Sequence, residues 1–375
     1  MTEPIPLLDL GAQHHSLHDE LVNAFERVLQ SGEFILGREV AAFEAEIASF
    51  LKCKHAIGVS SGSDALLAAL MALDIGPGDE VITPAFSFFA TAGCVARLGA
   101  KPVFVDIDPE TYNLDPNKIE HAVTSHTKAI IPVHLYGQPC DMQDIQSIAT
   151  ARRLAIVEDA AQAIGAQTSQ GPVGTLGSFG CFSFFPSKNL GCLGDGGLIT
   201  TQDDALAKHA RILRAHGSEP KYHHHVIGGN FRIDAVQAAF LRVKLKRLPQ
   251  WIQARQAHAQ TYDQLFKQAN LEPPLVSIPR RKHASHVYHQ YVIRTSRRPQ
   301  VIEQMTSEHI GHAIYYPEPL HLQPCFRYLG YAPGSLPHTE LACEQTLALP
   351  MFPELTPDQQ SRVVQSIVQA LSTHP

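Results

Sequence analysis

The chain has 375 residues, of which 44% are hydrophobic and 18% are charged, values typical of a globular protein that is neither disordered nor fibrous. Its 30 basic and 36 acidic residues give a net charge of −6, so no broad basic surface for nucleic acid is expected. Single cores stop growing at roughly 250 to 300 residues, so this length predicts two domains. We place a large domain at residues 1–250, with helices at its N-terminus, and a small C-terminal domain at residues 251–375.

Neither a signal peptide nor a membrane-spanning helix is expected. The N-terminal MTEPIPLLDL lacks a basic segment followed by an apolar one, and no run of about 18 apolar residues occurs. We therefore expect a cytoplasmic protein. The seven cysteines include no C-x-x-C pair, which argues against a disulfide framework and a zinc ribbon. We interpret them as buried thiols.

Two amphipathic helices are predicted first, because apolar residues recur at helical spacing over 17–28 and 40–50. Short apolar runs then alternate with helical stretches as far as about residue 200. These runs are 56–60, 80–84, 101–107, 129–137, 154–160 and 179–185. Such runs are typical of strands buried on both faces, so we predict an α/β fold with a mostly parallel sheet flanked by helices. Ligands of such sheets bind at the C-terminal ends of the strands.

Residues 204–262 are predicted to be helical again, with an amphipathic helix that ends near Pro249 and Trp251. Beyond them we expect a strand over 286–295 and a helix over 301–310. A proline-rich, loop-like segment over 315–353 and a closing helix over 357–371 follow. These elements compose the small domain, of α+β type.

The segment CFSFFPSKNLGCLGDGG, residues 181–197, contains the first candidate for chemistry. An apolar strand leads through Ser183 to Lys188 and then into a glycine-rich loop. Burying an ammonium lowers its pKa, so the neutral amine of such a lysine can act as a nucleophile. A surface lysine beside a flexible loop explains the pattern equally well.

Three more segments carry candidates. Asp159 ends the strand in AIVEDAAQAIGA and either caps the next helix or pairs with a protonated pyridine nitrogen. Ser60 to Ser63 form a strand-to-helix turn, which either caps the helix or binds a phosphate. Aromatic residues at 86, 88 and 89 follow another strand and either fill the core or stack on a planar cofactor. The order phosphate turn, aromatic, carboxylate and lysine favours the functional interpretation.

These motifs resemble the DegT/DnrJ/EryC1/StrS family of sugar aminotransferases, which depend on pyridoxal 5′-phosphate (PLP). The resemblance extends from DLGAQHHSL to LALPMFPELT. It implies the fold-type I, aspartate aminotransferase-like architecture, with PLP as cofactor. It is closest to the enzymes that aminate C3 of a nucleotide-linked sugar, through SFFPSKNLGCLGDGG, KYHHHVIGGN and YYPEPLHLQP. Some relatives have His-Tyr-Pro where this chain has Tyr315, Tyr316 and Pro317, a departure near the expected sugar.

The resemblance also implies a role for each matching residue. Lys188 forms the Schiff base, Asp159 holds the pyridine nitrogen, and Gln162 lies near the ring hydroxyl. Phe88 stacks on the ring. Phosphate contacts come from Gly62, Ser63, Ser183 and, from the neighbouring subunit of a homodimer, Asn230. Arg232, Tyr316 and His321 are candidates for contacts with the substrate.

The expected reaction moves an amino group from L-glutamate to a nucleotide-linked keto-sugar. The ketone is expected at C3 on a UDP- or dTDP-linked sugar, in amino-sugar and polysaccharide biosynthesis such as that of lipopolysaccharide. A 4-keto substrate is the alternative, as is a non-catalytic sensor of PLP or a sugar nucleotide with the same fold. A related dehydratase branch has histidine in place of the lysine, so Lys188 argues against it.

Two other classes of enzyme fit poorly. A nicotinamide-dependent oxidoreductase would need G-x-G-x-x-G after an early strand, whereas GTLGSFG at 174–180 has the wrong spacing. No metal site is expected either. His283, His286 and His289 enter a strand-like run in which neighbours three apart face opposite sides, so we interpret them as surface or interface histidines.

Overall fold

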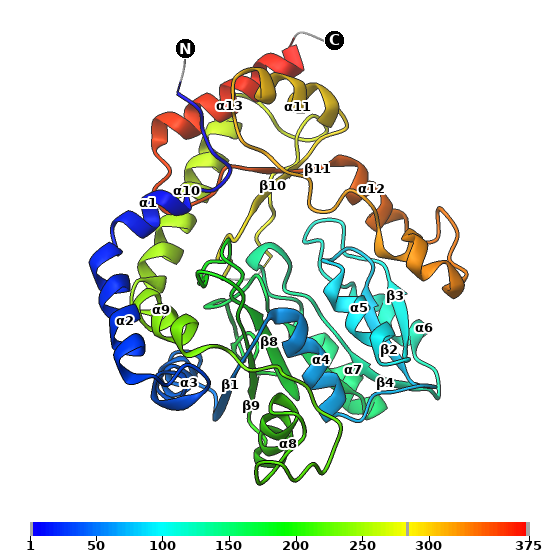
Figure 1. Cartoon of the computed structure of the whole chain (residues 1–375). Coiled ribbons are helices and arrows are strands. Elements are labelled where there is room, and N and C mark those ends of the chain that lie inside the picture. Colours follow the sequence, from blue (N-terminus) through cyan, green and yellow to red (C-terminus); the bar gives the residue numbers. More distant parts are fainter. Residues whose placement is uncertain (1–2, 283–284, 373–375) are drawn as a thin grey trace.

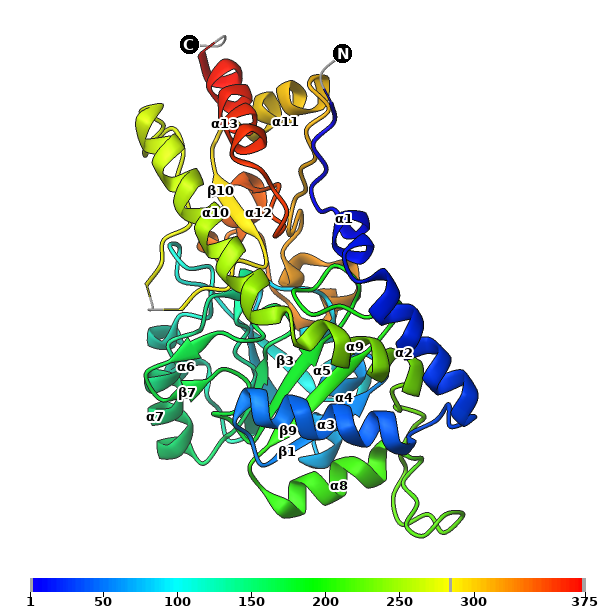
Figure 2. The same cartoon turned by 90° about the vertical axis from the view of Figure 1, so that its left-hand side faces the viewer.

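A seven-stranded sheet forms the centre of the molecule, shown as a computed structural model that describes residues 3–282 and 285–372 (Figures 1 and 2). Its order is β1 (His55–Val59), β9 (Gly197–Thr201), β8 (Phe179–Ser183), β5 (Ala155–Asp159), β4 (Thr127–Ile130), β2 (Glu80–Pro84) and β3 (Lys101–Val105). β9 pairs antiparallel with both of its neighbours, and the other pairs are parallel. The prediction of a mostly parallel sheet is confirmed.

Helices cover both faces of this sheet, because side chains alternate between the faces along each strand. On one face, Ile57, Val157 and Ile199 pack against α4 (Gly62–Ala72), α5 (Ala90–Arg97) and α8 (Asp204–Arg214). On the other face lie α2 (His18–Ser31), α3 (Gly37–Leu51), α6 (Pro116–Ala122), α7 (Met142–Arg152) and α9 (Ala235–Leu245). The two predicted N-terminal helices correspond to α2 and α3.

The C-terminal part has a core of its own. It contains α10 (Leu248–Gln268), β10 (Tyr291–Arg294), α11 (Arg298–Ser307), β11 (Thr346–Leu349) and α13 (Pro357–Ser372), together with the N-terminal Ile5. β10 and β11 form an antiparallel pair, and Figure 1 shows this part above the large sheet. The predicted domain boundary between residues 250 and 251 lies within α10 and stays a prediction.

Short elements complete the chain. They are α1 (Leu10–His15), α12 (Pro337–Gln345), the two-stranded pair β6 (Gln167–Thr168) and β7 (Gly171–Pro172), and the 3₁₀ turns η1 (Leu135–Gly137), η2 (Leu320–Leu322) and η3 (Pro324–Leu329). Among the described residues, no helix is both long and apolar enough to cross a membrane.

Several predicted elements were wrong. The segment 315–353 is not all loop, because it contains α12 and β11. Pro249 and Trp251 do not end a helix: α9 ends at Leu245 and α10 begins at Leu248, with the proline in its first turn, where the lack of an N–H costs nothing. The strand predicted over 129–137 ends at Ile130, and the one predicted over 286–295 is confined to β10.

Two statements about single residue types also need correction. All seven cysteines are free, but Cys53 is only half-buried and Cys325 is exposed. His286 and His289 are buried rather than at the surface, because the segment before β10 packs between two cores: Val287 belongs to the core of the large sheet and Tyr288 to that of the C-terminal part. His283 lies outside the described residues.

Candidate active site

A cavity of about 560 Å³ opens at the C-terminal ends of β1, β2, β4, β5 and β8, where ligands of parallel sheets bind. Its volume lies within the range of about 300–1,000 Å³ typical of small-molecule sites. The large sheet and its loops supply Ser61, Gly62, Ser63, Leu66, Ser87, Phe88, Ala90, Val133, Leu135, Asp159, Ala161, Gln162, Ser183, Phe185, Ser187, Lys188 and Asp195; the C-terminal part adds His289, Gln290, Tyr315 and Tyr316. The cavity therefore brings together side chains from distant parts of the sequence.

Asp159 is a buried carboxylate at the end of β5. Its Oδ2 accepts a hydrogen bond from the Thr91 hydroxyl at 2.8 Å, and its Oδ1 accepts one from the Ala161 N–H at 3.2 Å. Thr91 in turn contacts the Ser87 hydroxyl at 2.8 Å. Burial raises the pKa of Asp159 although these hydrogen bonds lower it. A cationic partner on the cavity side would keep this carboxylate ionised.

Lys188 lies on the cavity wall in the loop between β8 and β9. The loop is closed by hydrogen bonds from Phe184 N–H to Gly196 at 2.8 Å and from Cys192 N–H to Phe184 at 2.7 Å. Burial lowers the pKa of the Lys188 amine to about 8, against a smaller raising effect of the Asp159 charge. Roughly a tenth of such an amine is neutral at pH 7, compared with less than about a thousandth of an ordinary lysine. Lys188 is thus a competent nucleophile near neutral pH.

The turn after β1 approaches the end of β8 closely. Ser61 caps α4 by accepting a hydrogen bond from the Asp64 N–H at 3.0 Å. A Cβ atom on Gly62 would lie 2.6 Å from the Cβ of Ser183, so only glycine fits. The first N–H groups of a helix lack partners within the helix and favour anions. With Ser63 and Ser183 on the same wall, this end of the cavity suits a phosphate.

Gln162 and Tyr316 form a polar pair across the cavity. The Gln162 amide donates a hydrogen bond to the Tyr316 hydroxyl at 3.2 Å and accepts one from the Tyr136 N–H at 2.6 Å. Burial, followed by the Asp159 charge, raises the pKa of Tyr316, so its phenol stays protonated. The Phe88 ring lies 6.3 Å from the Tyr316 ring and is 59% exposed, which leaves room for a planar ligand against it.

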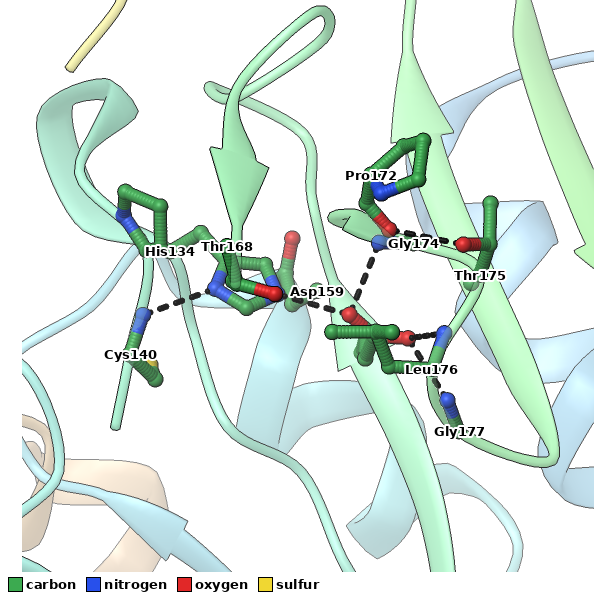
Figure 3. A network of polar contacts seen from close by, with 12 residues as sticks. His134, Cys140, Asp159, Thr168, Pro172, Gly174, Thr175, Leu176 and Gly177 are labelled. Carbon is green, nitrogen blue, oxygen red and sulfur yellow. Dashed lines mark hydrogen bonds and ion pairs between the residues drawn. The ribbon is translucent and has the colours of Figure 1, made fainter. Parts of the chain in front are cut away.

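A buried polar network lies behind Asp159 (Figure 3). The Glu158 carboxylate accepts hydrogen bonds from the N–H groups of Gly174, Leu176 and Gly177, each at 2.7 Å, and contacts His134 Nε2 at 3.0 Å. The other ring nitrogen of His134 accepts a hydrogen bond from the Cys140 N–H at 3.0 Å. His134 Nε2 therefore carries the proton and donates to Glu158. The backbone N–H of His134 also donates a hydrogen bond to the backbone carbonyl of Asp159 at 3.0 Å, which fixes the end of β5.

Three of the residues predicted for the site do not line this cavity. Asn230 is exposed, in the segment between α8 and α9. Arg232 is partly buried and pairs through its backbone with Val59. His321 is buried, and its Nε2 contacts Glu340 at 3.2 Å.

Sequence reasoning also missed residues of the site. Thr91, which bonds to Asp159, carries one signal: its hydroxyl lies one helical turn after Ser87. The cavity residues Ser187, His289 and Gln290 have no comparable motif. No cluster of three or more potential metal ligands occurs among residues 3–282 and 285–372.

Comparison with known proteins identifies the class. A model of the DegT/DnrJ/EryC1/StrS aminotransferase family matches residues 15–368. A pleiotropic regulatory protein of Geobacillus stearothermophilus is 51% identical over 366 residues, 97% of this chain and 98% of the relative. UDP-N-acetyl-3-dehydro-alpha-D-glucosamine 3-aminotransferase of Acidithiobacillus ferrooxidans is 45% identical over 367 residues, 98% of each chain. The structure of S. venezuelae DesV in complex with a ketimine intermediate has a TM-score of 0.94 at 41% identity and covers 98% of both chains.

The fold and the cavity therefore define a PLP-dependent aminotransferase. The chain belongs to the DegT/DnrJ/EryC1/StrS aminotransferase family. The predicted family, fold class, type of enzyme and cofactor are confirmed.

The residues of the cavity fit this cofactor. PLP, when bound, supplies an aldehyde that condenses with amines and a ring that accepts electrons. Lys188 offers an amine of lowered pKa, and Asp159 offers a buried carboxylate that suits a cationic ring nitrogen. The turn at Gly62, beside Ser183, offers a place for the phosphate, and a side chain at position 62 would collide with Ser183 there.

Proposed function

We propose that this enzyme transfers the amino group of L-glutamate to a nucleotide-linked 3-keto-sugar, with UDP or dTDP as the nucleotide. The observation that carries this proposal is that Lys188, Asp159 and Gly62 line the same cavity. The chain is also 45% identical to a 3-aminotransferase named for a UDP-linked 3-dehydro sugar. The volume of about 560 Å³ accommodates more than the cofactor alone. A 4-keto-sugar is the alternative acceptor.

Each cavity residue has a definite task in this proposal. Lys188, once its amine is free, moves a proton at the donor's α-carbon, and its pKa of about 8 suits both halves of that task. Asp159 holds the positive ring nitrogen, which favours accumulation of electrons on the ring. Gln162 and Tyr316, joined by their 3.2 Å hydrogen bond, offer an uncharged polar edge to the ring hydroxyl or the sugar.

We further propose that the active unit is a homodimer in the cytoplasm that serves amino-sugar and polysaccharide biosynthesis. Asn230 is exposed and away from the cavity of its own chain. The preceding loop also exposes Tyr222 and Ile227, at 82% and 91%. Both observations suit a loop that contributes to the cavity of a second subunit. Arg232 and His321 do not line the cavity of their own chain. They can contact the substrate only if the second subunit completes the site or the substrate extends beyond the cavity.

An activity panel tests the acceptor. The holoenzyme is incubated with glutamate and with UDP- or dTDP-linked 3-keto and 4-keto-sugars, and 2-oxoglutarate and the amino-sugar are measured. We expect turnover of a 3-keto-sugar at least about tenfold above that of its 4-keto isomer. Preference for the 4-keto isomer would overturn the proposed ketone position and leave the aminotransferase class intact.

A second measurement tests the alternative of a non-catalytic sensor. This alternative is relevant because the Geobacillus relative is named a regulatory protein. Glutamate alone converts an aminotransferase to its amine form and yields one equivalent of 2-oxoglutarate, whereas a sensor yields none. The K188A variant serves as the inactive reference, and K54A, at an exposed lysine paired with Asp204, serves as the matched control. We expect wild type and K54A to give the stoichiometric product.

A further inference from the structure

His289 is a buried histidine that shares the cavity with Lys188. Only 8% of it is exposed. Its backbone is held by Arg255, whose Nη1 donates to the carbonyls of Tyr288 and His289 at 3.2 Å each and to that of Met351 at 2.8 Å. The backbone of His289 is therefore fixed by the C-terminal part, while Lys188 comes from the large sheet.

The hydrogen bonds around His289 determine which ring nitrogen carries the proton. Asn189 follows Lys188 in the chain, and its amide nitrogen donates to the Val287 carbonyl at 3.2 Å. The amide oxygen of Asn189 is therefore the atom that lies 3.3 Å from His289 Nδ1. An amide oxygen only accepts, so Nδ1 donates. Nε2 is left with a lone pair.

The charges around His289 keep the imidazole neutral. Burial lowers its pKa well below the ordinary value, and the charges of Lys188 and then Arg255 lower it further. These two cations are the charged groups that act on the ring from the Lys188 loop and from α10. Protonation of Nε2 is opposed throughout the range in which the Lys188 amine titrates. Nε2 consequently remains an acceptor.

We propose that His289 is a positioning residue for Lys188: its Nε2 accepts a hydrogen bond from the Lys188 amine through one water whenever that amine is not covalently engaged. The bond stabilises the ammonium form and directs one N–H away from Asp159. The proton remains on Lys188, because the buried imidazole is the weaker base. No sequence motif assigned His289 to this site.

The first test compares two variants of nearly equal volume. His289→Gln retains a hydrogen-bonding group near the position of Nε2, whereas His289→Met does not. His286 provides the matched control, because it is buried three residues away, stacks on Tyr288 with ring centroids 3.9 Å apart and does not line the cavity. Thermal unfolding shows whether each variant folds.

The readout is the reactivity of Lys188 in the cofactor-free protein. Labelling with acetic anhydride across pH, followed by peptide mass spectrometry, gives the pKa of this amine. We expect H289M to lower the proton affinity of Lys188 about tenfold, the value of one hydrogen bond to a charged group. H289Q should restore most of it, and H286M should not change it. Equal pKa values in wild type and H289M would overturn the proposal.

A second measurement needs no substitution at His289. In the cofactor-free protein labelled with ¹⁵N-histidine, the Nε2 resonance reports whether that nitrogen accepts a hydrogen bond. We expect it to move toward the value of a free imidazole nitrogen in K188A and to stay unchanged in K54A. An Nε2 resonance that is identical in wild type and K188A would show that His289 only packs beside the site.

Discussion

Glu158 and Asp159 are consecutive residues at the end of β5, and their carboxylates lie on opposite sides of the strand in opposite surroundings. Glu158 is surrounded by four hydrogen-bond donors, three of them backbone N–H groups. Asp159 receives only two and turns its remaining edge to the cavity. One carboxylate is thus satisfied by the protein, and the other is left for a ligand.

Replacing Glu158 should damage the fold more than the chemistry. In E158Q, an amide N–H₂ group would face the N–H groups of the loop around Gly174, and a buried charge-assisted network would be broken. We expect a loss of about 3 kcal/mol in the free energy of unfolding, measured by urea denaturation. The control E120Q removes a surface carboxylate 3.5 Å from Arg152 and should cost less than about 1 kcal/mol. Equal losses would contradict the role given to the network.

Replacing Asp159 should damage the chemistry and stabilise the fold. Because burial raises the pKa of Asp159, the folded state retains a proton that the unfolded state has lost, and stability falls as pH rises through the folded pKa. Asparagine removes this penalty: its amide oxygen still accepts from the Ala161 N–H, and its amide N–H₂ group donates to the Thr91 hydroxyl. We expect cofactor-free D159N to unfold at a higher temperature than wild type at pH 7, while the holoenzyme loses activity about a hundredfold.

The control for D159N is D204N. Asp204 is exposed and paired with Lys54 and His55, and these partners lower its pKa. Its removal should not raise the unfolding temperature. A lower unfolding temperature for cofactor-free D159N than for wild type would show that the buried Asp159 carboxylate does not destabilise the folded protein.

The close approach of Gly62 to Ser183 predicts a selective loss of cofactor binding. In G62A, a Cβ 2.6 Å from the Ser183 Cβ would push the helix N-terminus away from the end of β8. We expect the dissociation constant of PLP to rise at least about tenfold, measured by equilibrium dialysis. G76A is the matched control, because a Cβ there meets nothing within 4 Å. Equal affinities for the two variants would exclude the phosphate site at this turn.

The lowered pKa of Lys188 predicts how PLP attaches. The neutral amine is the reactive form, so the rate of covalent attachment to the cofactor-free protein should rise with pH and level off above about 8, not near 10.5, the ordinary pKa of a lysine. Borohydride trapping and peptide mass spectrometry follow the adduct. K54A should give the same profile and K188A no adduct. A rate still rising steeply above pH 10 would contradict the burial of this amine.

The large sheet was largely predictable because its strands are continuous apolar runs, which a helix-forming pattern does not produce. β9 was missed because GLITT follows the glycine-rich loop after Lys188 and gains its strand character from pairing with β1 and β8. α12 did carry a local signal, since Pro337 stands in its first turn. The surrounding prolines obscured it.

The candidate site was predictable where its residues end strands. Asp159 ends β5, Ser183 ends the neighbouring β8, and Gly62 follows β1 in the same sheet, so the edge they share can be inferred from the order of motifs. His289 and Gln290 could not be inferred, because their place depends on how the C-terminal part packs, about a hundred residues beyond Lys188. The hydrogen bond between His289 and Asn189 is a tertiary contact without a local signature.

The Lys188 loop leaves β8 and returns directly as β9, its antiparallel neighbour. Both ends of the loop are therefore fixed to the same layer of backbone hydrogen bonds, and an inserted residue would displace the amine from the cofactor. Changes that adapt the enzyme to new acceptor sugars are therefore expected in peripheral loops. The number of residues between β8 and Lys188 should stay the same.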